Sequence, residues 1–209
     1  MALWLQSTRP AGQVAWGVDV AASCTLVKKD DVINRVLPQF FPKQWLDNPG
    51  IVFTDFPSRI RIGYVLRSDG AYSYLVDDEF AELGIAIAEL HAAAIANLAR
   101  LPSASISIGK VPGGAEGWLH ATDDNFAAAR ILLPGVQREF TEALGEQFLL
   151  SLSHRDDCFC WSLAQSPERQ QKHAREALER FLQEDYNLTP DILRYSRDGF
   201  SLHLEQVAT

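Results

Sequence analysis

Two runs of alternating apolar and polar residues, joined by an Asp-Gly pair, constrain the fold more than any other feature of this chain. Residues 60–67 and residues 71–76 alternate in this way, and Asp69-Gly70 lies between them. This arrangement predicts a β-hairpin, because glycine accepts the positive φ angle that the turn requires. The same arrangement recurs in residues 192–205 around Asp198-Gly199. The chain is therefore expected to contain antiparallel strands at both places.

Helical patterns lie between the two hairpins. Apolar residues recur three and four positions apart in residues 77–98, 124–133, 134–144 and 166–182. Ser166-Pro167 is the clearest helix start, because serine is a good N-cap and proline suits the first helical position. Further strands are expected over residues 103–108, 116–120, 148–152 and 158–163, with a loop over residues 109–114. Near the beginning, a short helix is expected from Asp30 to Leu37, after which Pro38 and Pro42 interrupt the chain.

The order of these segments favours an α+β fold. In this interpretation a mostly antiparallel sheet is built from hairpins, and helices pack on one side of it. Residues 29–209 are long enough to form a single domain with a substantial core. Residues 1–28 are expected to be an N-terminal arm or an extra element. The segment Ala21-Ala22-Ser23-Cys24 also resembles a lipoprotein cleavage box, but Asp19 interrupts the apolar stretch that such a signal needs.

The charge and the cysteine count exclude several classes of function. The chain has 27 acidic and 19 basic residues, a net charge of -8, and no basic run. Nucleic-acid binding depends on Lys and Arg displacing counterions, so a nucleic-acid partner is not expected. No run approaches the ~20 apolar residues of a membrane span, so no membrane association is expected either. Three cysteines are an odd number and too few for a disulfide framework. The cysteine count therefore favours a protein of the reducing cytoplasm.

The strongest candidate for chemistry is His154-Arg155-Asp156, which follows an apolar strand. A rigid sheet edge is a common place for an active site. In an enzyme, His154 would act as the base and Asp156 would orient it, while Arg130 or Arg155 would bind an anionic substrate. Asp124 is a further candidate for substrate binding. The alternative is an ordinary polar turn between two strands, held by pairing of Arg155 with Asp156.

Other motifs are better explained by structure than by chemistry. In a strand, Cys158 and Cys160 would point the same way with α-carbons about 6.6 Å apart, which suits neither a disulfide nor one zinc ion. They are expected to be small core residues. Residues 109–114 lack the spacing of a phosphate-binding loop, and no cofactor or metal is expected. The five tryptophans indicate either an exposed partner surface or core packing under loops.

Three motifs together resemble one known family. The segment Asp124-Asn125-Phe126-Ala127-Ala128-Ala129-Arg130-Ile131-Leu132-Leu133 is similar to the aspartate-plus-small-residue helix of the YtpQ-like family of uncharacterised bacterial proteins. Leu152-Ser153-His154-Arg155-Asp156 resembles its strand-end element, with Ser153 where that family tends to have proline, and Asp198-Gly199 has a counterpart in its last hairpin. The resemblance covers roughly residues 50–205. It implies a cytoplasmic α+β protein and no established activity.

These observations favour an uncharacterised soluble bacterial protein that acts as a binding or accessory module. Its partner would be a protein or a small molecule, and a homodimer is among the assemblies that the sequence leaves open. The alternative is a hydrolase-type enzyme with its site at His154-Arg155-Asp156. The enzyme hypothesis requires His154 and Asp124 to lie on the same face of the fold. The binding hypothesis favours a surface with exposed aromatic residues over a deep polar pocket.

Overall fold

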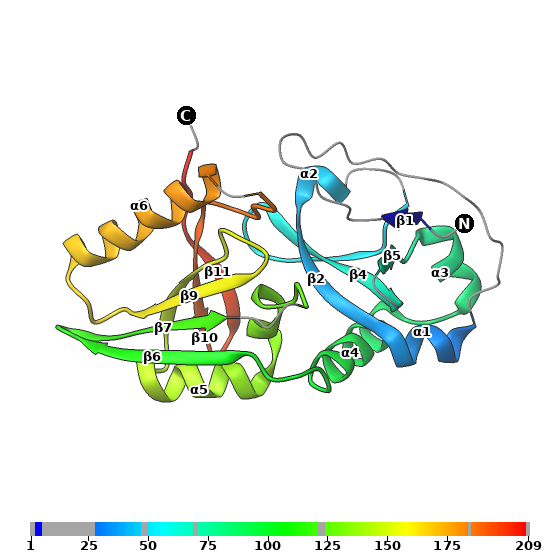
Figure 1. Cartoon of the computed structure of the whole chain (residues 1–209), viewed down its shortest axis with the longest axis horizontal. Helices are drawn as coiled ribbons and strands as arrows, with labels where there is room; N and C mark the ends of the chain where they lie inside the picture. The colour runs from blue at the N-terminus through cyan, green and yellow to red at the C-terminus, as the bar shows by residue number, and fades with distance from the viewer. Residues whose placement is uncertain are drawn as a thin grey trace.

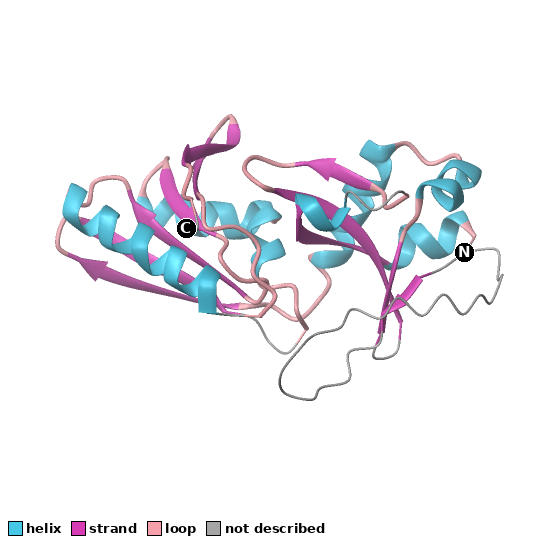
Figure 2. Ribbon diagram, turned by 90° about the horizontal axis from the view of Figure 1, so that it is seen from above, coloured by secondary structure: helices cyan, strands magenta, loops and turns pink. Residues whose placement is uncertain are grey.

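The computed structural model describes residues 3–5, 28–46, 50–68, 71–120, 124–183 and 185–207. Two antiparallel sheets lie side by side along the long axis of the molecule (Figure 1). Helices surround both sheets, as the view from above shows (Figure 2). The predicted α+β class, with antiparallel sheets built from hairpins, is confirmed. The predicted arm falls on residues of which the structure describes only Leu3–Leu5 and Lys28.

The first sheet is built around one long central strand, β4 (Ile60–Ser68). On one side β4 pairs with β2 (Val36–Pro42), and on the other it pairs with β5 (Ala71–Tyr74) and β3 (Phe53–Asp55). The predicted hairpin is confirmed, since Ser68 lies opposite Ala71 across the turn. β1 (Leu3–Leu5) pairs with β5 and completes the five strands.

Four helices flank the first sheet in the chain order: α1 (Lys29–Arg35), α2 (Lys43–Leu46), α3 (Asp77–Leu83) and α4 (Ile87–Leu98). The long helical pattern after residue 77 is broken at Gly84, whose φ of 61° ends α3. The predicted helix from Asp30 is shorter than expected, because strand β2 begins at Val36 and runs through both prolines.

The second sheet has six strands in the order β11-β10-β8-β9-β7-β6. Their bounds are β6 (Ser105–Val111), β7 (Gly114–His120), β8 (Phe148–Ser151), β9 (Asp157–Ser162), β10 (Ile192–Ser196) and β11 (Gly199–Leu204). The predicted C-terminal hairpin is confirmed as β10 and β11. The predicted loop over residues 109–114 is wrong, because β6 and β7 are joined by the short turn Pro112-Gly113, where Gly113 has a φ of 84°.

Three helical segments accompany the second sheet: η1, a 3-10 helix (Ala128–Leu132), α5 (Pro134–Leu144) and α6 (Pro167–Gln183). The segment from Asp124 to Leu133 was expected to be one helix. The structure has a turn and then η1, because Asn125 adopts a φ of 63°, a left-handed conformation that cannot start a right-handed helix.

The helical cover differs from the expected one-sided arrangement. On the second sheet, α5 packs through Phe140 and Leu144 on the face that carries Phe148 and Leu150. On the opposite face, α6 packs through Ala174 and Ala177 on Leu149, Phe159, Trp161 and Ile192. The reason is visible in the sequence of β8 and β9, whose successive residues are nearly all apolar, so that both faces of the sheet need cover.

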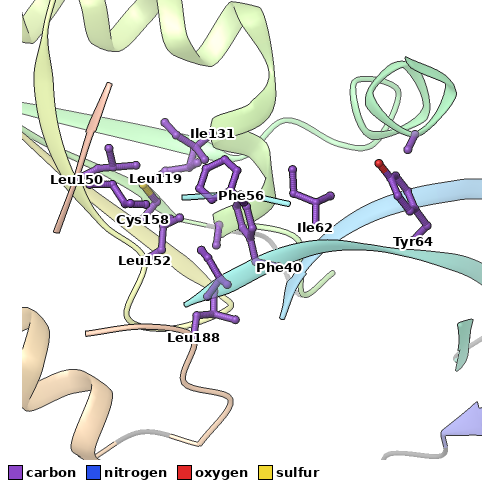
Figure 3. Packing of buried hydrophobic residues seen from close by; sticks show 14 of the residues in the cluster. Phe40, Phe56, Ile62, Tyr64, Leu119, Ile131, Leu150, Leu152, Cys158 and Leu188 are labelled. Atoms are coloured by element: carbon purple, nitrogen blue, oxygen red, sulfur yellow. The ribbon is translucent and has the colours of Figure 1, made fainter. Parts of the chain in front are cut away.

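One hydrophobic cluster crosses from the first sheet to the second (Figure 3). Phe40 and Ile62 of the first sheet belong to the same buried cluster as Leu119, Leu150 and Cys158 of the second. Phe56, which follows β3, lies between them, with its ring centroid 4.8 Å from that of Phe40 and 5.1 Å from that of Phe200. The two sheets therefore share a core.

Among the described residues, no single helix has the length and apolar composition to cross a membrane; α3 and α4 would meet that requirement only together, across a bend of 99°.

Candidate functional site

The predicted catalytic residue His154 lies in the turn between β8 and β9. Its Nδ1 atom accepts a hydrogen bond from the backbone N–H of Asp156 at 3.0 Å. A backbone N–H is always a donor, so Nδ1 holds no proton, and the neutral ring carries its proton on Nε2. The Asp156 carboxylate is 3.9 Å from Nδ1, beyond hydrogen-bond distance. The arrangement is therefore not the one in which a carboxylate orients a histidine base by accepting from Nδ1–H.

Arg130 and Asp124, both predicted to bind substrate, instead bind each other inside the protein. The Arg130 side chain is 2% exposed and that of Asp124 is 9% exposed, and two guanidinium nitrogens contact the two carboxylate oxygens. Arg130 also donates to the carbonyl of Pro102 at 2.9 Å. Burial works against ionisation of Asp124, but hydrogen bonds from Arg130 and from the N–H of Phe126 hold its pKa below the ordinary value.

Arg155 joins the turn to the Asp124 segment. Its guanidinium donates to the side chain of Asn125 at 3.1 Å and lies over the ring of Tyr186, 3.9 Å from the centroid. Its carbonyl accepts from the N–H of Ala128. The structure thus brings the turn and the Asp124 segment together, as the enzyme hypothesis requires. The charged atoms, however, are used to connect the two segments.

Tyr74 faces the same junction. Burial raises the pKa of Tyr74 to about 12, and the nearby Arg155 charge opposes the shift. Tyr72 also contributes, because its hydroxyl donates to the carbonyl of Asp124 at 3.0 Å. The five predicted site residues therefore lie at a polar junction between the two sheets.

Sequence reasoning missed a second polar cluster, which attaches α6 to the sheet. His173, 5% exposed, has its Nε2 atom 2.8 Å from Oε1 of Glu116 on β7. Arg169 donates to the same oxygen at 2.7 Å. Burial opposes ionisation of Glu116, but the bonds from Arg169 and His173 lower its pKa. His173 lies on the apolar side of α6 next to Ala174, a position that signals a buried and partnered histidine.

Burial also affects a third polar contact, between Asp157 on β9 and Arg180 on α6. Desolvation raises the pKa of Asp157, while the charge and the hydrogen bond of Arg180 oppose the rise. The Arg180 guanidinium lies 4.8 Å from the ring centroid of Trp118. This contact holds the C-terminal turn of α6 against β7 and β9.

An open groove lies on the α6 side of the second sheet, with a volume of about 380 Å³. Its floor is apolar and comes from three neighbouring strands: Leu149 of β8, Trp161 of β9 and Ile192 of β10. The N-terminal half of α6 forms one wall and β11 forms the other, through Pro167, Glu168, Gln170, Gln171, Ala174, His203 and Leu204. A site of this size suits a small ligand.

Trp161 gives this groove a polar feature. Its side chain is fully buried, and its Nε1–H has no hydrogen-bond partner among the described residues. A buried donor without an acceptor costs about 1–3 kcal/mol, and such a group calls for an explanation. His203 lies at the opposite wall, where burial and the charge of Arg194 lower its pKa, so its ring stays neutral at physiological pH.

The cysteines and tryptophans agree mainly with the structural explanations. Cys158 and Cys160 are free, fully buried core residues with sulfur atoms 3.6 Å apart. Burial raises the pKa of the Cys160 thiol, which keeps it protonated. Trp161 is buried and Trp118 is half-buried against Phe159, while the side chains of the other three tryptophans lie outside the described residues.

Within the described part of the chain, no three His, Cys, Asp or Glu side chains gather closely enough to hold a metal ion. Comparison with protein-family models, with curated proteins and with solved structures finds no match to this chain.

Proposed function

We propose that this chain is a binding or accessory module that takes up a small, largely apolar ligand in the groove between α6 and β11. The observation that carries the proposal is the apolar groove floor of Leu149, Trp161 and Ile192, together with the buried indole N–H of Trp161, which lacks an acceptor among the described residues. The proposal includes that the protein is bacterial and cytoplasmic and is related to the YtpQ-like family, on the basis of the motifs around Asp124 and His154.

The chemistry of the groove suggests the class of ligand. An apolar body would cover Leu149 and Ile192, and a carbonyl or ether oxygen would accept from Nε1 of Trp161. Pairing a buried donor in this way removes an existing cost and gives the ligand an orientation. The carboxylate of Glu168 at the groove wall disfavours an anionic ligand. A neutral ketone, amide or ester fits these features best.

The hydrolase hypothesis has less support. A general base needs a free lone pair directed at the substrate, and Nδ1 of His154 already accepts from the backbone. Arg130, the proposed substrate-binding residue, is buried against Asp124. These contacts give the turn a structural role, so the groove is the better candidate for function.

Thermal-shift measurements with matched compounds test the proposal. Aromatic ketones and amides should raise the melting temperature more than hydrocarbons of the same shape, because a ligand that binds the native state stabilises it by mass action. Trp161→Phe should abolish the difference between the two sets, and Gln171→Trp, which narrows the groove, should weaken both.

His154→Ala is the control variant. It should leave the response to ketones and amides unchanged, since the turn lies outside the groove lining. A response that is lost in His154→Ala and kept in Trp161→Phe would contradict the proposal and return the search to the strand-end turn. Equal shifts for ketones and hydrocarbons would contradict the assigned role of Trp161.

A further inference from the structure

Strand β6 is an open edge of the six-stranded sheet. Among the described strands it pairs with β7 alone, in an unbroken register from Ser105 opposite His120 to Val111 opposite Gly114. Five of its seven residues are exposed, including Ile108 at 40%. The hairpin of β6 and β7 lies at the end of the molecule away from the first sheet (Figure 1). Nothing in the described chain covers this edge.

The other sheet edges carry features that discourage pairing with another chain. β11 has an irregular register with β10 at Ile192 and Leu193, and charged Arg197 and Glu205 flank it. β2 is buried along its length and contains two prolines, and β1 has three residues. Natural proteins use bulges, prolines, charges and short strands to protect such edges. β6 has none of them apart from Lys110.

The backbone of β6 offers hydrogen bonds on its outer side. Val111 and Gly114 flank a two-residue turn, so they form a hydrogen-bonded pair, and bonded and non-bonded pairs alternate from there along the strands. Gly109, Ser107 and Ser105 therefore bond toward β7. The N–H and C=O groups of Ile106, Ile108 and Lys110 point away from β7.

We propose that β6 pairs antiparallel with β6 of a second copy of this chain, with the two-fold axis at Ile108. In this register Ile108 meets its own copy, and Ile106 lies opposite Lys110. Ile106, Ile108 and Lys110 of one copy then lie opposite the same three residues of the other copy. Their outward N–H and C=O groups therefore face each other, as a hydrogen-bonded ladder requires.

The charges of the strand favour a second copy as the occupant. The chain has a net charge of -8, which opposes self-association over most of its surface. β6 contains no acidic residue, and its one charge, Lys110, faces an isoleucine in the proposed register. The two copies of Lys110 would be about 14 Å apart along the strands, farther than the screening length at physiological salt. This edge is therefore where two copies approach with little repulsion.

Disulfide trapping tests the register residue by residue. In a background with Cys24→Ser, Ile108→Cys should form a covalent dimer under mild oxidation, because α-carbons opposite each other in a hydrogen-bonded pair are about 5.5 Å apart, within disulfide range. Ile106→Cys is the matched control, and it should stay uncrosslinked since its copies lie about 14 Å apart along the strands. Combining Ile106→Cys with Lys110→Cys should restore crosslinking.

Sedimentation of the unmodified chain gives an independent measurement. It should show a dimer that dissociates on dilution, and Ile108→Lys should yield a monomer at every concentration. At dilutions where the parent chain is also monomeric, the variant should have the same melting temperature as the parent. A parent chain that is monomeric throughout would overturn the proposal and leave the edge to a strand of another protein. Equal crosslinking of Ile108→Cys and Ile106→Cys would overturn the register. Ligand binding in the groove, at the far side of the sheet, does not depend on either result.

Discussion

At the scale of single residues, this chain uses its charged groups as internal connections. Arg130 binds Asp124 inside the protein, and Arg155 links the turn after β8 to Asn125. The sequence predicted that these residues would lie near each other, because a strand end and a small-residue helix both placed polar groups at one region. It could not predict that the charges face inward, since that depends on contacts between segments far apart in the chain, such as Arg130 with Pro102.

Breaking the Arg130–Asp124 pair should be strongly destabilising. Arg130→Ala leaves a buried carboxylate without a partner, so we expect the free energy of unfolding to fall by about 3–5 kcal/mol in urea titrations.

The pH dependence of stability follows from the lowered pKa of Asp124. The pair stabilises the fold above the unfolded pKa, near the ordinary aspartate value of 3.8, and this contribution is lost as the pH falls through the folded pKa. Asp124→Asn should flatten the stability profile in that acidic range; an unchanged profile would show that another carboxylate governs it.

At the scale of elements, the strands with an alternating or continuous apolar pattern were predicted, whereas β1, β2 and β3 were not. β4 and β5 carried both alternation and an Asp-Gly turn, and both are present. β2 was missed because its two prolines suggested a break, although β2 is an edge strand, and edge strands tolerate proline. The end of β6 was predicted to be a loop because residues 109–114 contain three glycines and a proline. Composition describes the preference of single residues, whereas the end of β6 is held in a strand by its pairing with β7.

The packing of α5 against β7 depends on a glycine. A methyl group at Gly117 would lie 2.6 Å from the ring of Phe140, which is fully buried, so Gly117→Ala should lower the free energy of unfolding by about 1–3 kcal/mol. Gly135→Ala is the matched control, because it meets no atom within 4 Å and lies in α5, where alanine is the better helix former. It should raise stability by about 0.5–1 kcal/mol. Equal effects in thermal unfolding would mean that helix propensity, not the Phe140 contact, decides both.

At the scale of the whole molecule, the sequence predicted the class but not the division into two sheets. Hairpins are local, so their strands could be identified, but the order β10-β8-β9 joins segments from distant parts of the chain. Helices on both faces follow from strands such as β9, in which apolar side chains point both ways. One contribution to the connection between the sheets comes from Phe56, an aromatic residue that belongs to no periodic pattern. Such a residue gives no sign in the sequence of which surfaces it joins.

The shared core predicts that both sheets unfold together. Native-state hydrogen exchange should give β4 and β9 the same free energy of opening, because the cluster around Phe40, Phe56 and Leu150 belongs to both sheets (Figure 3). Phe56→Ala removes a buried ring from that cluster and should lower both values equally, by about 3–5 kcal/mol. Phe53→Ala, which removes a half-buried ring that packs within the first sheet, should cost less. Different opening energies for β4 and β9 in the parent chain would show that the sheets fold as separate units, in spite of the cluster that crosses between them.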